Sequence, residues 1–149
     1  MALQIKPSVT NPTIAAIYQD IESGKLILKP DFQRKFVWTH DHQEAFIDTI
    51  LKGYPFPEIY VCQGSIDTKK LKTIEHVIDG QQRLTTLKKY IDDDFDKPLT
   101  AIKGFTDLNE DEREQFLAYQ IVVRDLGKVD DATIREVFKR INLTKFKLE

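Results

Sequence analysis

The segment Val77-Ile78-Asp79-Gly80-Gln81-Gln82-Arg83-Leu84 decides the fold, because it predicts a strand, a tight turn and a helix in immediate succession. The predicted strand begins at Lys72 and is apolar where it ends. Gly80 permits a tight turn, since glycine adopts backbone conformations that other residues avoid. Residues 81–91 then repeat apolar side chains at helical spacing. The segment therefore predicts a helix whose first turn directly follows a strand.

Such a helix start is a suitable place for an anion. The first N–H groups of a helix lack internal partners, and the helix dipole adds partial positive charge that favours phosphate. Arg83 offers a planar fork to phosphate oxygens, and Gln81 and Gln82 add neutral donors and acceptors. Asp79 would repel phosphate unless a hydrated Mg²⁺ or an activated water stands between them. The residues alone equally allow a plain cap, a turn glycine and a solvated arginine, so both interpretations stay open at this point.

Working outward, periodicity and turn residues predict the order helix, strand, helix, strand, strand, helix, helix, strand, helix. The expected helix starts are Asn11-Pro12, Thr39, Gln81, Asn109 with Glu112 as its capping-box partner, and Asp130 or Asp131. The expected strands are residues 26–28, 58–63, 72–78 and 120–124, with a polar turn at 64–70 joining an antiparallel pair. This order predicts a compact α+β domain with a small mixed sheet and surrounding helices.

Composition fits one soluble domain spanning residues 1–149. The chain is 41% hydrophobic and 31% charged, and no apolar run approaches the length of a membrane span. The N-terminus does not resemble a signal peptide, and the single cysteine, Cys62, lies in an apolar stretch typical of a buried thiol. We therefore expect a cytoplasmic protein without a membrane partner. A net charge of −2 argues against a strongly basic DNA-binding domain.

Three motifs in order carry a resemblance to a known family. The segment Ile78-Asp79-Gly80-Gln81-Gln82-Arg83-Leu84-Thr85-Thr86-Leu87 resembles the signature of the GmrSD restriction endonuclease N-terminal domain. Upstream, Pro30-Asp31-Phe32-Gln33-Arg34-Lys35-Phe36-Val37-Trp38 is similar to the family's Gln-Arg…Trp motif. Downstream, Phe138-Lys139-Arg140-Ile141-Asn142 is similar to its Phe-x-Arg-x-Asn motif. The resemblance covers residues 12–142, and a ten-residue match with two ordered companions is specific.

The resemblance implies a fold similar to ParB and sulfiredoxin and a nucleoside triphosphate site with Mg²⁺. Within such a site, Asp79 would orient Mg²⁺ or the attacking water, and Arg83 would offset charge on the phosphoryl oxygens. Asp79 and Arg83 are therefore the candidate catalytic residues, and Asp79 is the candidate metal contact through Mg²⁺. The implied nucleotide- and phosphate-binding residues are Gln33, Arg34, Gly80, Gln81, Gln82, Arg140 and Asn142. The implied function is nucleotide binding, with hydrolysis, in a regulatory module of a DNA-targeting restriction or anti-phage defence protein.

The sequence departs from the family's pattern: the third motif is followed by Leu143 and Thr144 where a glycine is usual, and a second departure limits this expectation. Family members usually carry a C-terminal HNH-type nuclease domain, whereas this sequence stops at Glu149, soon after the third motif. We therefore expect no nuclease activity from this chain, and contact with DNA through a full-length protein or a partner nuclease domain. Homo-oligomerisation and the identity of the base stay open.

Two alternatives use the same residues differently. In the first, the pocket binds a DNA backbone phosphate or an anionic partner, and nothing is hydrolysed. The second is sulfiredoxin-like or ParB-like nuclease chemistry. Sulfiredoxin chemistry fits poorly, because it needs a reactive cysteine after the phosphate turn, where this chain has Gln82, and Cys62 lies elsewhere.

Several conspicuous residues favour structural interpretations. Trp38 is expected to belong to the core rather than to stack on a base. The three histidines do not form a zinc pattern, since no cysteine or carboxylate cluster completes one. Lys69, Lys70 and Lys72, with Lys88 and Lys89, are the best local basic candidates for DNA or partner contact, although a solvated face is their ordinary interpretation.

Overall fold

A computed structural model describes residues 4–28, 38–69 and 71–148 of the chain. Within these residues, one mixed sheet has the strand order β1-β5-β3-β4-β2. The strands are β1 (Ser8–Thr10), β2 (Leu26–Ile27), β3 (Ile59–Asp67), β4 (Lys72–Asp79) and β5 (Val123–Asp125). β1 pairs with β5 and β3 with β4 in antiparallel fashion, whereas β2 pairs with β4 and β3 with β5 in parallel. The predicted α+β class with a small mixed sheet is confirmed.

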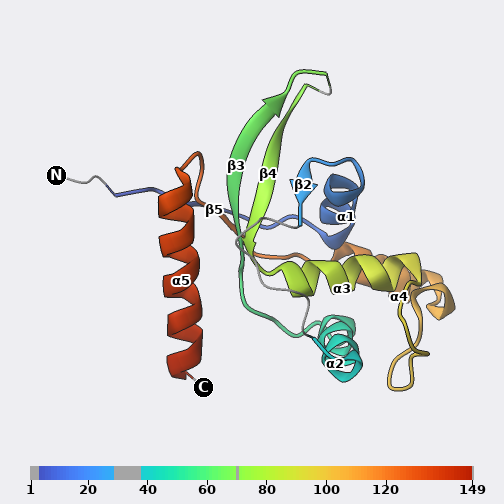
Figure 1. Cartoon of the computed structure of the whole chain (residues 1–149). Coiled ribbons are helices and arrows are strands. Elements are labelled where there is room, and N and C mark those ends of the chain that lie inside the picture. Colours follow the sequence, from blue (N-terminus) through green and yellow to red (C-terminus); the bar gives the residue numbers. More distant parts are fainter. Residues whose placement is uncertain (1–3, 29–37, 70, 149) are drawn as a thin grey trace.

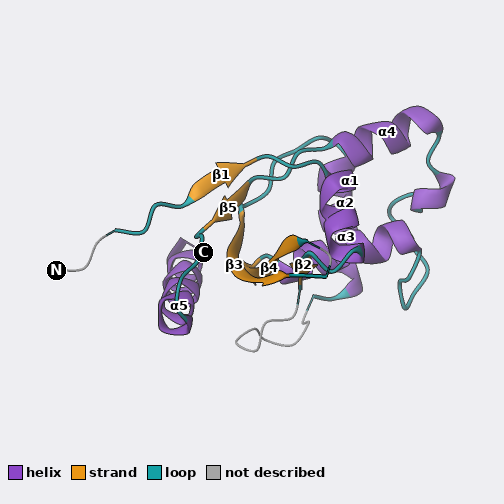
Figure 2. Ribbon diagram, turned by 90° about the horizontal axis from the view of Figure 1, so that it is seen from above, coloured by secondary structure: helices purple, strands orange, loops and turns teal. Residues whose placement is uncertain are grey.

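Helices cover both faces of this sheet (Figures 1 and 2). They are α1 (Ile14–Glu22), α2 (His40–Leu51), α3 (Gln81–Asp92), α4 (Glu110–Ala118) and α5 (Asp131–Leu148), with a short 3-10 turn at Phe105–Asp107. α1 to α4 gather on one side, and α5 lies alone on the other. None of the helices in the described part of the chain has the length and apolar character that crossing a bilayer requires.

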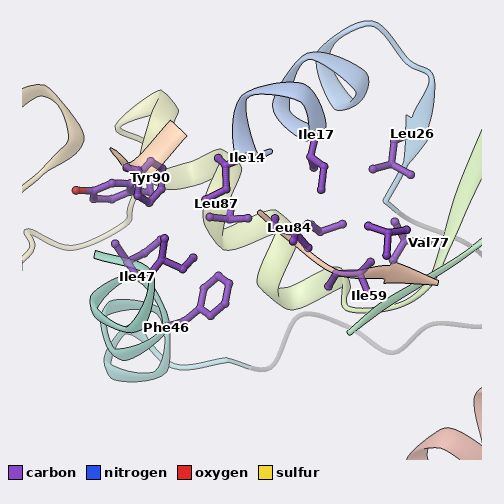
Figure 3. Packing of buried hydrophobic residues seen from close by; sticks show 14 of the residues in the cluster. Ile14, Ile17, Leu26, Phe46, Ile47, Ile59, Val77, Leu84, Leu87 and Tyr90 are labelled. Atoms are coloured by element: carbon purple, nitrogen blue, oxygen red, sulfur yellow. The ribbon is translucent and has the colours of Figure 1, made fainter. Parts of the chain in front are cut away.

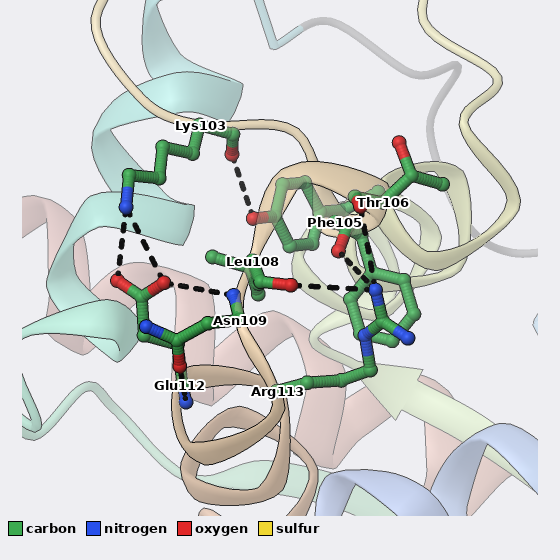
Figure 4. A network of polar contacts seen from close by, with 8 residues as sticks. Lys103, Phe105, Thr106, Leu108, Asn109, Glu112 and Arg113 are labelled. Atoms are coloured by element: carbon green, nitrogen blue, oxygen red, sulfur yellow. Dashed lines mark hydrogen bonds and ion pairs between the residues drawn. The ribbon is translucent and has the colours of Figure 1, made fainter.

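The helix starts follow capping chemistry that the sequence predicted. Thr39 Oγ1 accepts from His42 N at 3.2 Å, and His42 Nδ1 accepts from Thr39 N at 3.2 Å. Asn109 and Glu112 make the same reciprocal pair at 2.9 Å in each direction (Figure 4). Asp130 caps α5 through Oδ1. Each cap satisfies N–H groups that have no partner inside the helix.

Several predicted boundaries were wrong, and the strand expected at residues 120–124 is β5, which begins only at Val123. α1 starts at Ile14 with Thr13 as its cap, rather than at Asn11-Pro12. The cause is tertiary: Pro12 O accepts from Ile121 N at 2.8 Å, and Thr13 pairs with Gln120, which keeps this stretch extended. The polar turn predicted at residues 64–70 is shorter, because β3 continues to Asp67 through a register shift.

The core consists of two clusters on opposite faces of the sheet. The larger one unites α1, α2 and α3 with inward-facing strand residues such as Ile59 and Val77 (Figure 3). The smaller one includes Cys62, Ile78 and Ile134 and lies under α5. Adjacent residues Val77 and Ile78 therefore face different clusters, as the alternation of side chains along a strand requires.

Candidate functional site

The turn between β4 and α3 depends on glycine. Gly80 has φ +111°, in the region that side chains other than glycine's rarely adopt. A Cβ built on Gly80 would lie 2.3 Å from Ile59 Cδ1. The turn therefore packs against the Ile59 side chain of β3, and a Cβ at residue 80 would force the end of that side chain to shift.

The N-terminus of α3 has no side-chain cap. Gly80 occupies the cap position and supplies only its carbonyl, which accepts from Leu84 N at 3.0 Å. Gln81 Nε2 is buried and finds no hydrogen-bond partner among the described residues. A helix start without a side-chain cap, next to a buried amide donor without a partner, is a place where an anion would satisfy groups that the protein leaves unsatisfied.

Asp79 and Arg83 form a buried pair, 7% and 8% exposed. Asp79 Oδ2 lies 3.5 Å from Arg83 Nη2. The guanidinium also donates to the carbonyls of Pro57 and Glu58, the second at 3.2 Å, and lies 5.6 Å from the Phe56 ring centre. Burial lowers the pKa of Arg83, and the nearby Asp79 carboxylate opposes that effect. Arg83 thus joins the turn to the segment that precedes β3, a role that the sequence did not predict.

The first motif reaches the turn through its last residue. Trp38 N donates to Gln82 Oε1 at 2.7 Å, and the Trp38 ring packs edge-on against Phe46 at 5.4 Å. Trp38 packs against the larger cluster, which confirms the core interpretation of this side chain. Gln33 and Arg34 lie outside the described residues. The part of the first motif that is described therefore contacts the second motif.

The third motif lies on α5, across the sheet from α3. Phe138 packs against the cluster that contains Ile78, the first residue of the second motif. Asn142 Nδ2 donates to Phe138 O at 2.8 Å. Arg140 Nε donates to Glu136 Oε1 at 2.7 Å, and the Arg140 side chain is 76% exposed. These contacts lie within α5, so closure of the site by Arg140 and Asn142 stays a prediction.

Among the described residues, Trp38 of the first motif thus contacts Gln82, and Phe138 of the third motif packs against the cluster that contains Ile78. The family model of the GmrSD restriction endonuclease, N-terminal domain, matches residues 14–149. The chain belongs to this family. No curated protein and no solved structure matched the chain, so the finer likeness to ParB and sulfiredoxin stays a prediction.

This GmrSD N-terminal domain also has a polar cluster beside the turn that the motifs did not reveal. Glu58 accepts from Arg124 Nε and Nη2 at 3.0 and 3.1 Å. The hydrogen bond from Arg124 lowers the pKa of Glu58. Tyr60 lies opposite both Asp79 and Arg124 in the sheet. These residues come together only because β3 pairs with both β4 and β5. Their spacing in the sequence therefore does not predict the cluster.

A direct contact between Asp79 and Mg²⁺ does not fit the pair described above. The described residues hold no group of three His, Cys, Asp or Glu side chains suited to a metal. Asp79 is a single buried carboxylate whose charge Arg83 already balances. Mg²⁺ commonly binds through few carboxylates and several phosphate oxygens. A cation at this GmrSD N-terminal domain would therefore depend on the phosphates it accompanies.

Proposed function

We propose that this chain is the nucleotide-binding regulatory module of a restriction or anti-phage defence protein, with the phosphates held at the N-terminus of α3. The observation that carries the proposal is that the cap residue of α3, Gly80, has no side chain, next to a buried Gln81 Nε2 that has no hydrogen-bond partner among the described residues. The N–H groups and dipole of the helix start would attract a polyphosphate, and Gly80 would allow close approach. Membership of the GmrSD family supports the restriction context.

The roles divide between binding and support. Gln81 and Gln82 would contact the phosphates, and Gln33, Arg34, Arg140 and Asn142 would complete the site as the family resemblance implies. Asp79 and Arg83 hold the turn in place, because their described contacts join it to the segment before β3. Mg²⁺ would bind together with the nucleotide and neutralise part of the negative charge of its phosphates.

Hydrolysis is a separate part of the proposal, with Asp79 and Arg83 as its candidate catalytic residues. Arg83 could stabilise charge on a phosphoryl group only by exchanging its carbonyl acceptors for phosphoryl oxygens. Binding at the helix start requires no such exchange. The proposed consequence of binding is a change in how the module contacts DNA, through the full-length protein or a partner nuclease domain.

The test uses Gln82→Glu, with Gln19→Glu as a control. The glutamate keeps an acceptor for Trp38 N and places a negative charge where the helix dipole favours it, so the fold should persist. The same charge should repel phosphate. We expect Mg²⁺-dependent binding of a fluorescent nucleoside triphosphate to weaken at least tenfold. Gln19 is exposed on α1, and its substitution makes the same charge change away from the turn, so its affinity should match wild type.

Several results would decide against the proposal. Wild-type protein without saturable nucleotide binding would overturn it, and so would equal affinities for the two glutamate variants. Phosphate release then separates hydrolysis from binding alone. DNA binding that depends steeply on salt, by a wild-type protein that shows no saturable nucleotide binding, would favour the non-enzymatic DNA- or partner-binding module.

Alanine at Arg83 is a poor test of the site. Truncation would leave the Asp79 carboxylate buried without its partner, a loss on the order of 3–5 kcal/mol in comparable buried pairs. Such a variant could lose nucleotide binding simply because it unfolds. Gln82 is preferable because its substitution keeps the described hydrogen bond.

A further inference from the structure

The β3–β4 hairpin extends well beyond the rest of the sheet (Figure 1). β5 pairs with β3 only at residues 59–61, and β2 pairs with β4 only at Glu75 and His76. The pairing of β3 with β4 continues to Asp67 and Lys72. Residues 64–67 and their partners therefore form a two-stranded ribbon. At roughly 3.3 Å per residue it is about 13 Å long before the turn.

The end of this ribbon exposes large aliphatic side chains. Leu71 is 84% exposed and Ile66 is 67% exposed, more than any other large hydrophobic residue in the described part of the chain. Leu71 also has φ +55°, a left-handed conformation that a leucine rarely adopts. The two most exposed large hydrophobic side chains thus lie at the same end of the ribbon, and locally strained residues are found at functional sites.

The charge around these side chains is positive, unlike that of the whole chain. Residues 64–74 contain three lysines and one aspartate, whereas the chain carries a net charge of −2. Among the described side chains, Lys69 is exposed between Ile66 and Leu71. Lysines beside an aliphatic tip suit a partner with anionic groups flanking an apolar surface.

We propose that the β3–β4 ribbon is an arm that enters the major groove of duplex DNA. That groove admits a two-stranded ribbon and is about 8.5 Å deep, less than the free length of the hairpin. Lys69 contacts the phosphates that border the groove, and Ile66 and Leu71 contact base edges, including the thymine methyl group. The arm adds a surface to the proposed function and does not require nucleotide at α3.

The test is the affinity of the full chain for a fluorescent duplex at several salt concentrations. Leu71→Asn removes the aliphatic side chain at nearly constant size, and asparagine tolerates φ above zero, so the hairpin should persist. We expect a loss of affinity of about 3- to 30-fold. Lys69→Gln should reduce the slope of log K against log salt by about 0.9. Lys97→Gln, at an exposed lysine in the loop after α3, is the charge-matched control and should behave as wild type.

The inference is overturned if wild-type protein does not bind duplex DNA, or if both tip variants bind as tightly as the control. A change in oligomeric state without a change in DNA affinity would also overturn it, because the tip would then contact another protein molecule. The tip variants should keep nucleotide affinity, and Gln82→Glu should keep nucleotide-free DNA binding. Failure of the arm and failure of the nucleotide site are therefore distinguishable.

Discussion

Gly80 links the local backbone to the candidate site. Its φ of +111° aims the chain from β4 into α3, and the missing Cβ leaves room for Ile59. Any larger residue at position 80 would lower the stability of the fold in two ways, through backbone strain and through overpacking against Ile59. Each is worth about 1–3 kcal/mol in other proteins.

We therefore predict that Gly80→Ala destabilises the chain by roughly 2–4 kcal/mol. Gly104→Ala is the matched control, because Gly104 has φ −67° and a Cβ there would come no closer than 3.4 Å to Asp107 Oδ2. Urea unfolding of both variants gives the free energies of unfolding. Similar midpoints for the two alanine variants would show that the turn tolerates a side chain.

The sequence predicted the turn but not the role of Arg83. A strand, a glycine and a helix follow from local patterns, whereas the acceptors of Arg83 lie in a segment before β3 that no local pattern connects to it. One local signal was available: Asp79 and Arg83 carry opposite charges and lie only four residues apart, on the two sides of the tight turn. Burial of that pair could be seen only after β3 and β4 were placed side by side.

Among the elements, α2 holds the loop between α3 and α4 through one buried carboxylate. Glu44 Oε1 accepts from Thr100 N and Ala101 N, each at 2.9 Å. Its Oε2 lies 3.1 Å from His40 Nε2. Burial acts to raise the pKa of Glu44, but these hydrogen bonds and the interaction with His40 outweigh it, so the pKa is lowered.

This shift predicts the response of stability to acid. Because the folded pKa lies below the unfolded value of about 4.3, the contribution of Glu44 is present above that pH and is lost as pH falls through the folded pKa. Melting temperatures between pH 7 and pH 3 should fall less steeply for Glu44→Gln than for wild type. Glu114→Gln, at an exposed position on α4, should follow the wild-type profile. Parallel profiles for Glu44→Gln and wild type would contradict this prediction.

Elements with periodic apolar residues were predicted well from the sequence, and those defined by tertiary pairing were not. α3 and the capping of α2, α4 and α5 follow from local spacing. β1 was missed, because all three of its residues are exposed and it exists only through pairing with β5. The hairpin was predicted too short because Gly64, Ser65 and Asp67 are residue types typical of turns, whereas β3 continues through them to Asp67.

For the whole molecule, the sheet separates two cores of unequal size. The larger one binds four helices together, and the smaller one holds α5 through residues such as Ile134 and Leu126. Cys62 belongs to the smaller core, and burial raises the pKa of its thiol to about 11. A thiol of this kind reacts when α5 moves away, because it is otherwise buried and protonated.

We predict that α5 opens before the rest of the molecule unfolds. Ile134→Ala should increase the rate at which Cys62 is labelled by a maleimide at neutral pH, by at least tenfold. Ile17→Ala removes the same atoms from the larger core. For an equal loss of unfolding free energy, it should accelerate the labelling of Cys62 less than Ile134→Ala does. Equal acceleration in both variants would mean that the two cores unfold as one unit.

The pairing of Ser8 with Asp125 has a consequence for how the protein is made. A growing polypeptide leaves the ribosome from its N-terminus, so β1 emerges long before the strand it needs. Its segment must stay unpaired during most of translation, and closing so long a loop is slow compared with forming a local hairpin. β1 is thus synthesised before the other strands of this sheet but is among the last of them to be placed.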